Sequence, residues 1–251
     1  MLDEDDTLHD VRPAGARSRL FVSAGTPACG RDAGRYLRRL GHRRAAWFTV
    51  FADDAWSRNR LAGLREGFGG ESAAVREWQA ASVDADLQDS GKVAQVLTTL
   101  RRLGVTQSAR SISAASAEDQ ARTIVRRQML RERLWPLFEA AIRDDAVTGW
   151  VGANDDIALQ CLEFLRERPV DVPGRVSVVG FDDTFDATYW QMTSYSFRTP
   201  AVVSSMLAHV LRPEWRSGRD QAAGAREIDG RVVERATSGP APGARAARSS
   251  Q

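Results

Sequence analysis

The chain has 251 residues, of which 43% are hydrophobic and 27% are charged. This length allows one large domain or two modest ones, and the composition excludes a fibrous or fully disordered chain. Lysine and arginine number 35 against 33 acidic residues, and Lys92 is the only lysine. Codon usage in a GC-rich genome explains the arginine bias most simply. An arginine-rich functional surface is the alternative, although such surfaces usually carry a clustered excess of positive charge.

Three features of the sequence indicate the cellular compartment in which the protein is expected. Cys29 and Cys161 lie far apart and form neither a disulfide framework nor a metal site, which fits a reducing environment. No stretch approaches the roughly 18 consecutive apolar residues that would suggest a membrane span. Residues 1–10 are acidic, unlike a secretory signal. We therefore expect a cytoplasmic protein without membrane contact.

The first third of the chain alternates strands and helices. Residues 1–18 are polar and are predicted to form a loose tail, and a short strand is expected at 19–23. The apolar spacing over 30–44 predicts a helix. The continuous apolar run at 45–51 is typical of a strand buried on both faces of a parallel sheet, and 53–70 reads as a loop and a helix. This alternation predicts an α/β fold.

The middle of the chain is less regular. We expect a strand at 74–80 and an amphipathic helix at 89–104. Residues 105–132 are polar and arginine-rich, and they are interpreted as a partly helical insertion without a clear place in the alternation. A helix is expected to restart at 135–145, with Pro136 in its first turn.

The alternation of predicted strands and helices becomes regular again towards the C-terminus. We expect a strand at 146–154, a helix at 155–168 and another strand at 174–181. A helix is predicted at 201–211. The segment 226–235 reads as a β-hairpin around its Asp-Gly pair, which is a strong two-residue turn signal.

Polar side chains follow three of the expected strands. They are Asp53 and Asp54, Asn154 and Asp155, and Asp182 and Asp183. Ligands bind outside the carboxyl ends of the strands in an open parallel sheet, so we expect these side chains near one site. Acids and amides hydrogen-bond to hydroxyl groups, and an arginine completes such a set. The pattern therefore favours a sugar or a similar polyol.

Aromatic residues would provide the apolar surfaces of such a site. The candidates for stacking are Trp56, Trp150, Phe185, Tyr189 and Trp190. Trp150 lies inside an apolar run, which favours a place in the core instead.

The polar candidates have alternatives as well. For Asp155 or Asp156 the alternative is a cap on the following helix, and for Arg60 the alternative is a solvated position on its helix. No clear helix follows Asp182, so ligand or interdomain contact is favoured there. His42, next to a glycine, is most simply a helix-end group.

Motifs that carry catalysis are missing from the sequence. We find no G-x-S-x-G, P-loop, H-E-x-x-H or G-x-G-x-x-G motif, and no catalytic constellation can be assembled. We expect no enzymatic activity, no cofactor and no metal site.

Five segments follow one another in a recognisable order. They are "YLRRLGHRRAAWF", "RLAGLREGF", "GWVGANDDIALQCLEFLRERPVDVPGRVSVVGFDDT", "TSYSF" and "GRVVERATSGP". Their order and spacing resemble the sensor domain of the LacI/GalR family of transcriptional regulators. The resemblance covers about 20–104 and 135–240, which is most of the chain.

This resemblance implies a periplasmic-binding-protein-like type I fold, with two doubly wound parallel-sheet lobes and an effector in the cleft between them. By position, Arg60, Asn154 and Asp182 match the places that contact effector in the family. The candidate ligand-binding set is Arg60, Asn154, Asp182, Asp155, Asp183, Asp54, Trp56 and Phe185.

The resemblance also implies partners and a division of the chain. We expect a carbohydrate effector, a homodimer, and contact with DNA only through a domain that is not present in this chain. The expected parts are a tail at 1–18, a partial N-terminal lobe at 19–75, a C-terminal lobe at 76–192 with the insertion at about 105–132, a return to the N-terminal lobe with a closing hairpin at 193–238, and a disordered tail at 239–251.

The sequence departs from the family pattern at three places. No helix-turn-helix precedes the sensor, and the first elements of the N-terminal lobe are missing, so this lobe is expected to be incomplete. Leu64 follows Gly63 where an aromatic residue is usual, and the stretch 105–132 is long. The favoured function is effector sensing and dimerisation in a regulator. A stand-alone sugar-binding protein, a truncated non-functional remnant and an enzyme are the alternatives.

Overall fold

The computed structural model describes residues 2–3, 21–22, 26–89, 91–103, 114–211, 226–227 and 229–243. Its centre is a six-stranded sheet with the order β4-β3-β5-β6-β7-β9, in which the five neighbours β4 to β7 are parallel and β9 is antiparallel to β7. The strands are β3 (Ala45–Thr49), β4 (Val75–Gln79), β5 (Gly149–Gly152), β6 (Ser177–Phe181), β7 (Thr193–Ser196) and β9 (Arg231–Val233).

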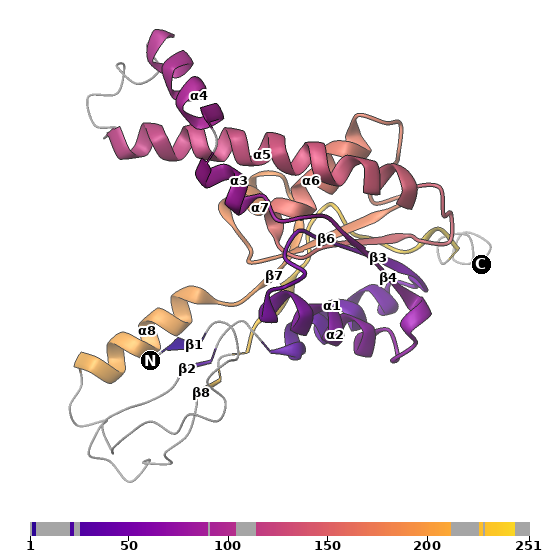
Figure 1. The fold of residues 1–251 in the computed structure, drawn as a ribbon. Helices are drawn as coiled ribbons and strands as arrows, with labels where there is room; N and C mark the ends of the chain where they lie inside the picture. Colours follow the sequence, from indigo (N-terminus) through magenta and orange to yellow (C-terminus); the bar gives the residue numbers. More distant parts are fainter. Residues whose placement is uncertain are drawn as a thin grey trace.

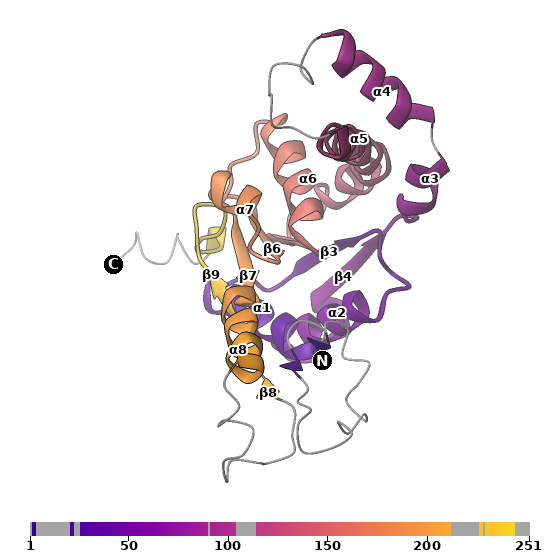
Figure 2. The same ribbon diagram turned by 90° about the vertical axis from the view of Figure 1, so that its left-hand side faces the viewer.

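Helices cover both faces of this sheet. The helices of the described residues are α1 (Pro27–Arg39), α2 (Ala55–Gly67), α3 (Asp84–Asp89), α4 (Gly91–Arg102), α5 (Ala114–Ala141), α6 (Asp155–Arg166), α7 (Phe185–Tyr189) and α8 (Thr199–Leu211), with a 3-10 turn at Ser72–Ala74. Helices α1 and α2 lie on one face, and α5 and α6 lie on the other (Figures 1 and 2).

A second, three-stranded sheet lies apart from the first. It has the order β1-β2-β8 and is built from β1 (Leu2–Asp3), β2 (Phe21–Val22) and β8 (Arg226–Glu227). Helix α8 extends beside it, away from the six-stranded sheet (Figure 1).

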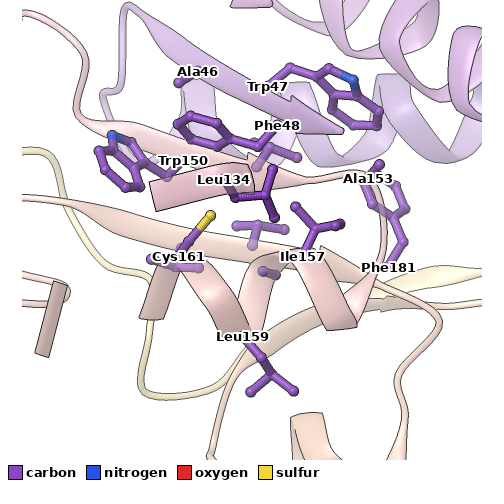
Figure 3. Close-up of a cluster of buried hydrophobic side chains, with 14 of the residues drawn as sticks. Ala46, Trp47, Phe48, Leu134, Trp150, Ala153, Ile157, Leu159, Cys161 and Phe181 are labelled. Carbon is purple, nitrogen blue, oxygen red and sulfur yellow. The ribbon is translucent and has the colours of Figure 1, made fainter. Parts of the chain in front are cut away.

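The core lies on both faces of the central strands, because helices exclude water from each face. Phe48 and Trp150 are fully buried, with ring centroids 4.9 Å apart, and Phe138 of α5 packs 4.8 Å from Phe48. Figure 3 shows Phe48 beside Trp150. Trp47 points to the opposite face, as alternate strand residues do, and packs 6.1 Å from Phe181. Trp150 is therefore a core residue and not a stacking surface, as its position inside an apolar run favoured.

Glycines bring α1 and α2 into close contact. Gly30 and Gly34 on α1 face Gly63 and Gly67 on α2. A Cβ atom on Gly30 would lie 1.9 Å from the carbonyl oxygen of Arg60, and one on Gly34 would lie 2.9 Å from the Cα atom of Gly67. No larger residue fits without moving a helix. This contact fixes α2, and with it Arg60, against the sheet.

Helix α5 corrects the interpretation of residues 105–132. The helix runs without interruption through Pro136, so it does not restart at 135. The part 104–113 lies outside the described residues. Ala121, Val125 and Leu130 are buried, which makes this arginine-rich stretch part of the core packing. The helical spacing of these apolar residues puts one face of α5 inside and leaves most of its arginines outside.

The expected hairpin at 226–235 is also wrong. Strand β8 pairs with β2, whereas β9 pairs with β7, so the two strands belong to different sheets. Gly230 is required there for another reason, because a Cβ atom would lie 2.4 Å from Cε1 of Tyr195.

The sheet also crosses the expected division of the chain. Strands β3 and β4 pair in the same sheet as β5, β6 and β7, so neither residue 75 nor residue 192 marks a sheet boundary. The tails differ as well. Leu2–Asp3 forms β1 within the expected loose tail. Ala241 is buried and its N–H donates to the carbonyl oxygen of Leu40 at 2.8 Å, so residues 239–241 pack on the domain.

Candidate ligand-binding site

Arg60 links the carboxyl ends of two neighbouring strands. It lies on α2 and is only 5% exposed. Its Nη1 donates to the carbonyl oxygen of Ala153, directly after β5, at 2.7 Å. Its Nη2 donates to Oδ1 of Asp182, directly after β6, at 3.1 Å. The structure therefore brings two of the predicted site residues together.

Aromatic rings surround the Arg60 guanidinium. Its central carbon lies 4.5 Å from the ring centre of Trp56, 4.8 Å from that of Phe197 and 5.1 Å from that of Phe181. Such contacts stabilise a desolvated cation by up to about 2 kcal/mol. Trp56 was predicted as a stacking residue, whereas Phe181 and Phe197 were missed. Phe181 was missed because it lies in an apolar strand and was assigned to the core. Phe197 was missed because it lies far from Arg60 in the sequence.

The Asp182 carboxylate is partly exposed although it forms an ion pair with Arg60. Its side chain is 37% exposed, and its N–H donates to the carbonyl oxygen of Tyr195 at 2.9 Å. Its φ of 103° lies in a region that residues other than glycine rarely adopt, and such strain clusters at functional sites. Burial raises the pKa of the Asp182 carboxyl group, and the Arg60 cation opposes this rise. The carboxylate is placed to accept a hydrogen bond from a hydroxyl group.

Asp155 is a structural clamp. It is 1% exposed, and its Oδ2 accepts from the N–H of Thr184 at 2.8 Å and from the hydroxyl group of Thr184 at 2.9 Å. Its Oδ1 accepts from the hydroxyl group of Ser194 at 2.7 Å. Burial raises the pKa of Asp155 to about 7, although these hydrogen bonds oppose the shift. The side chain fixes the loop after β6 to β7 and has no open face for a ligand.

Asn154 and Asp54 stand at helix starts. Asn154 caps α6, because its Oδ1 accepts from the N–H of Ile157 at 3.1 Å. It is half-buried, next to the Ala153 carbonyl group that binds Arg60. Asp54 precedes α2 and is exposed, with no side-chain cap hydrogen bond.

Asp183 turns to a different partner from that of Asp182. Its Oδ1 lies 2.5 Å from Nη2 of Arg235, and the two side chains are 20% and 13% exposed. Arg235 also donates to the carbonyl oxygen of Met192 at 2.8 Å. The pair ties the loop after β6 to the segment after β9. The sequence prediction missed Arg235, although it lies in "GRVVERATSGP", the last of the five segments that carry the family resemblance.

Phe185 stands on the short helix α7 and is 80% exposed. It stacks on Tyr189 with ring centres 6.5 Å apart, and Tyr189 meets Trp190 at 5.4 Å. These three predicted aromatic residues form their own surface group. Thr184, and not Asp182, caps α7, so the short helix does not explain Asp182.

His42 connects distant parts of the chain. It is fully buried, with Nδ1 2.8 Å from the hydroxyl oxygen of Thr148 and Nε2 3.1 Å from the carbonyl oxygen of Gly239. Burial lowers the pKa of His42. His42 therefore has a structural role that goes beyond the helix-end group expected from the sequence.

The described ranges contain no helix that is long and apolar enough to cross a membrane. They also contain no group of three or more His, Cys, Asp or Glu side chains that is placed to hold a metal ion.

Comparisons with known proteins bear on this geometry. The periplasmic binding protein-like domain matches residues 35–238. The transcriptional regulator AscG of Escherichia coli is 39% identical over 61 residues, which are 24% of this chain and 18% of AscG. This chain thus spans only a small share of its curated relative.

Solved structures share the fold. A LacI transcriptional regulator from a Rhodococcus species is 21% identical with a TM-score of 0.53, and the match covers 95% of this chain and 69% of that one. A LacI-family regulator from Enterococcus faecium, solved with bound ribose, is 14% identical with a TM-score of 0.53, over 95% and 70% of the two chains. The chain belongs to the periplasmic binding protein-like domain family, whose model matches residues 35–238.

Proposed function

We propose that this chain senses a sugar or a similar small polyol, and that Arg60 and Asp182 bind it. The observation that carries the proposal is the Asp182 carboxylate, which is 37% exposed and is held at the carboxyl end of β6 by a buried arginine. A fixed acceptor beside a fixed cation suits hydroxyl groups. Trp56 and Phe197 flank the guanidinium and offer apolar faces to a sugar ring.

The ligand would lie between the six-stranded sheet and the part that carries α8 and the small sheet. We infer a two-lobed arrangement in which that smaller part belongs to an incomplete N-terminal lobe. The similarity to a regulator solved with ribose supports a pentose among the first ligands to test. Asn154 directly follows the Ala153 carbonyl group that binds Arg60, so we include it as a second contact.

We further propose that the chain acts in the cytoplasm as a homodimer and reaches DNA through a domain outside these 251 residues. Helix α8 supports a protein partner, because Val203, Leu207 and Leu211 repeat every four residues and are 47%, 52% and 71% exposed. Sedimentation of the chain tests the dimer. A monomer at micromolar concentration would contradict it.

A thermal-shift screen tests ligand binding. The chain would be heated with a panel of pentoses and hexoses that begins with D-ribose. A ligand that binds only the folded state raises stability by about 2.7 kcal/mol at one hundred times its Kd. We expect at least one sugar to raise the Tm. If no sugar in the panel raises the Tm at millimolar concentration, the proposed ligand class is wrong.

A further inference from the structure

A pocket of about 280 Å³ lies at the amino ends of β3 and β4, and three arginines line it. Arg43 and Arg44 directly precede β3, and Arg38 stands in the last turn of α1. The pocket is therefore at the opposite end of the parallel strands from the Arg60–Asp182 pair. Its volume is just below the range of about 300–1,000 Å³ that is typical of drug-sized ligands, so it suits a smaller molecule.

The sequence around this pocket carries a clustered excess of positive charge. Residues 33–52 contain five arginines and no acidic residue, although the whole chain has 35 basic and 33 acidic residues. Codon usage explains why arginine takes the place of lysine, but it does not explain why acids are missing from this stretch. A local excess of this kind is typical of a surface that binds anions.

The acids near these arginines leave them without a partner. On the same two helices, Arg31 pairs with Glu66 at 2.6 Å, and Arg65 pairs with Glu77 at 3.3 Å. Glu71 lines the pocket, but within the described residues it forms no ion pair. Three cations therefore face one carboxylate in this pocket, and they remain available to an anion.

The backbone around the pocket holds the arginines in place. Nη1 of Arg38 donates to the carbonyl oxygen of Phe68, at the end of α2, at 2.9 Å. Gly69 makes this position possible, because a Cβ atom there would lie 2.6 Å from the same nitrogen. The carbonyl oxygen of Arg44 accepts from the N–H of Gly149 at 3.3 Å, which fixes the base of its side chain. A guanidinium has five N–H groups, so Arg38 keeps donors for a ligand.

We propose that this pocket binds a small molecule that carries a phosphate group, independently of the sugar site. Arg38, Arg43 and Arg44 donate to the phosphate oxygens. Arginine suits this group because its planar guanidinium donates two parallel hydrogen bonds to a phosphate. Glu71 accepts from a hydroxyl group of the ligand, and the exposed Ala73 contacts its carbon atoms.

Calorimetric titration of the full chain with sn-glycerol 3-phosphate, at constant ionic strength, tests the site. D-glycerate is the matched ligand, because it has the same three-carbon body with a carboxylate in place of the phosphate group. We expect glycerol 3-phosphate to bind at least about tenfold more tightly than glycerate, which corresponds to one charge-assisted hydrogen bond. Asp182→Ala should leave this affinity unchanged, so failure here is distinguishable from failure of the sugar proposal.

Two arginines of the same basic stretch provide a matched pair of variants. Arg44→Gln removes a cation from the pocket and should weaken glycerol 3-phosphate about tenfold. Arg35→Gln makes the same change of charge at an exposed position of α1 that does not line the pocket, so it should leave the affinity unchanged. Glu71→Gln should strengthen the binding of inorganic phosphate several-fold, because it removes the carboxylate that faces the anion.

Three outcomes would overturn the proposal. They are the absence of glycerol 3-phosphate binding at millimolar concentration, equal affinity for glycerate, and equal weakening by Arg35→Gln and Arg44→Gln. The last result would mean that the charge of the whole stretch attracts anions without a defined site. Displacement of the bound glycerol 3-phosphate by a DNA duplex of random sequence would also contradict a small-molecule pocket. Circular dichroism and the Tm of each variant establish that it is folded.

Discussion

Asp182 and Asp183 are neighbours in the sequence, and each pairs with an arginine, but the two pairs differ in their surroundings. In the Asp182–Arg60 pair the acid is 37% exposed at 3.1 Å from its partner, and in the Asp183–Arg235 pair the acid is 20% exposed at 2.5 Å. Both acids have positive φ, 103° and 52°, so the chain turns sharply between them. The first pair leaves part of its carboxylate exposed, where we propose that a ligand binds, whereas the second pair joins two segments of the fold.

Breaking the Asp183–Arg235 pair should have the largest effect on stability. Arg235→Met leaves the Asp183 carboxylate largely buried and without its cation, and such losses cost about 3 kcal/mol. Urea denaturation measures the change. The double variant Arg235→Met with Asp183→Asn removes the unpaired charge and should recover part of the loss. A single variant as stable as the parent chain would show that this pair does not hold the loop.

Arg60→Met should cost somewhat less stability, about 2 kcal/mol. It removes the contacts with three rings and the hydrogen bond to Ala153, but Asp182 is exposed enough to gain water. Sugar binding should be lost altogether. Urea denaturation gives the stability, and calorimetry gives the affinity. A folded Arg60→Met protein that still binds sugar with parental affinity contradicts the site.

The pH dependence of stability should reveal Asp155. Burial raises the folded-state pKa of Asp155 from 3.8 to about 7, so the folded state binds this proton more tightly than the unfolded state. Its contribution to stability is present below about pH 4 and is lost as the pH rises towards 7. Asp155→Asn should flatten this part of the profile of unfolding free energy against pH. An unchanged slope in the variant would show that the three hydrogen bonds keep Asp155 ionised.

The smallest expected effect on stability is that of Asp182→Asn. Asp182 is partly exposed, and the buried Arg60 keeps its contacts with the rings and its hydrogen bond to Ala153, so we expect a loss of about 1 kcal/mol or less. The substitution also leaves an amide that can still contact Arg60. A loss similar to that of Arg235→Met would mean that the two pairs have the same structural role.

The sequence predicted the central strands because they follow simple patterns, whereas Arg60 and Asp182 were placed in one site by the family resemblance and their ion pair was not predicted. Continuous apolar runs mark buried parallel strands, and their carboxyl ends share one edge of the sheet. The pairing of Asp183 with Arg235 was not predictable, because the two residues lie 52 positions apart. The periodicity of a helix or strand relates only residues that are close in the sequence. The buried role of Asp155 was hidden for the same reason, because Thr184 and Ser194 reach it only in the folded chain.

Helix α5 shows a second limit. Its arginines suggested an insertion, but Ala121, Val125 and Leu134 bury one face of the helix against the rest of the domain. The arginine-rich composition of the segment reflects the exposed face of α5, and it gave no indication that the other face is buried. In the same way, the Asp-Gly pair at 229–230 marked a change of direction correctly but did not reveal that the strands on either side join different sheets.

Calorimetric titration of Asp182→Asn and Asp183→Asn, side by side with the parent chain, tests the central claim most directly. The ligand is the sugar that raises the Tm of the parent chain most. We predict that Asp182→Asn weakens binding at least about tenfold, which corresponds to one charge-assisted hydrogen bond. Asp183→Asn should bind like the parent chain at a temperature where it is folded. Equal losses in both variants, or full affinity in Asp182→Asn, would contradict the assignment of Asp182 to the ligand.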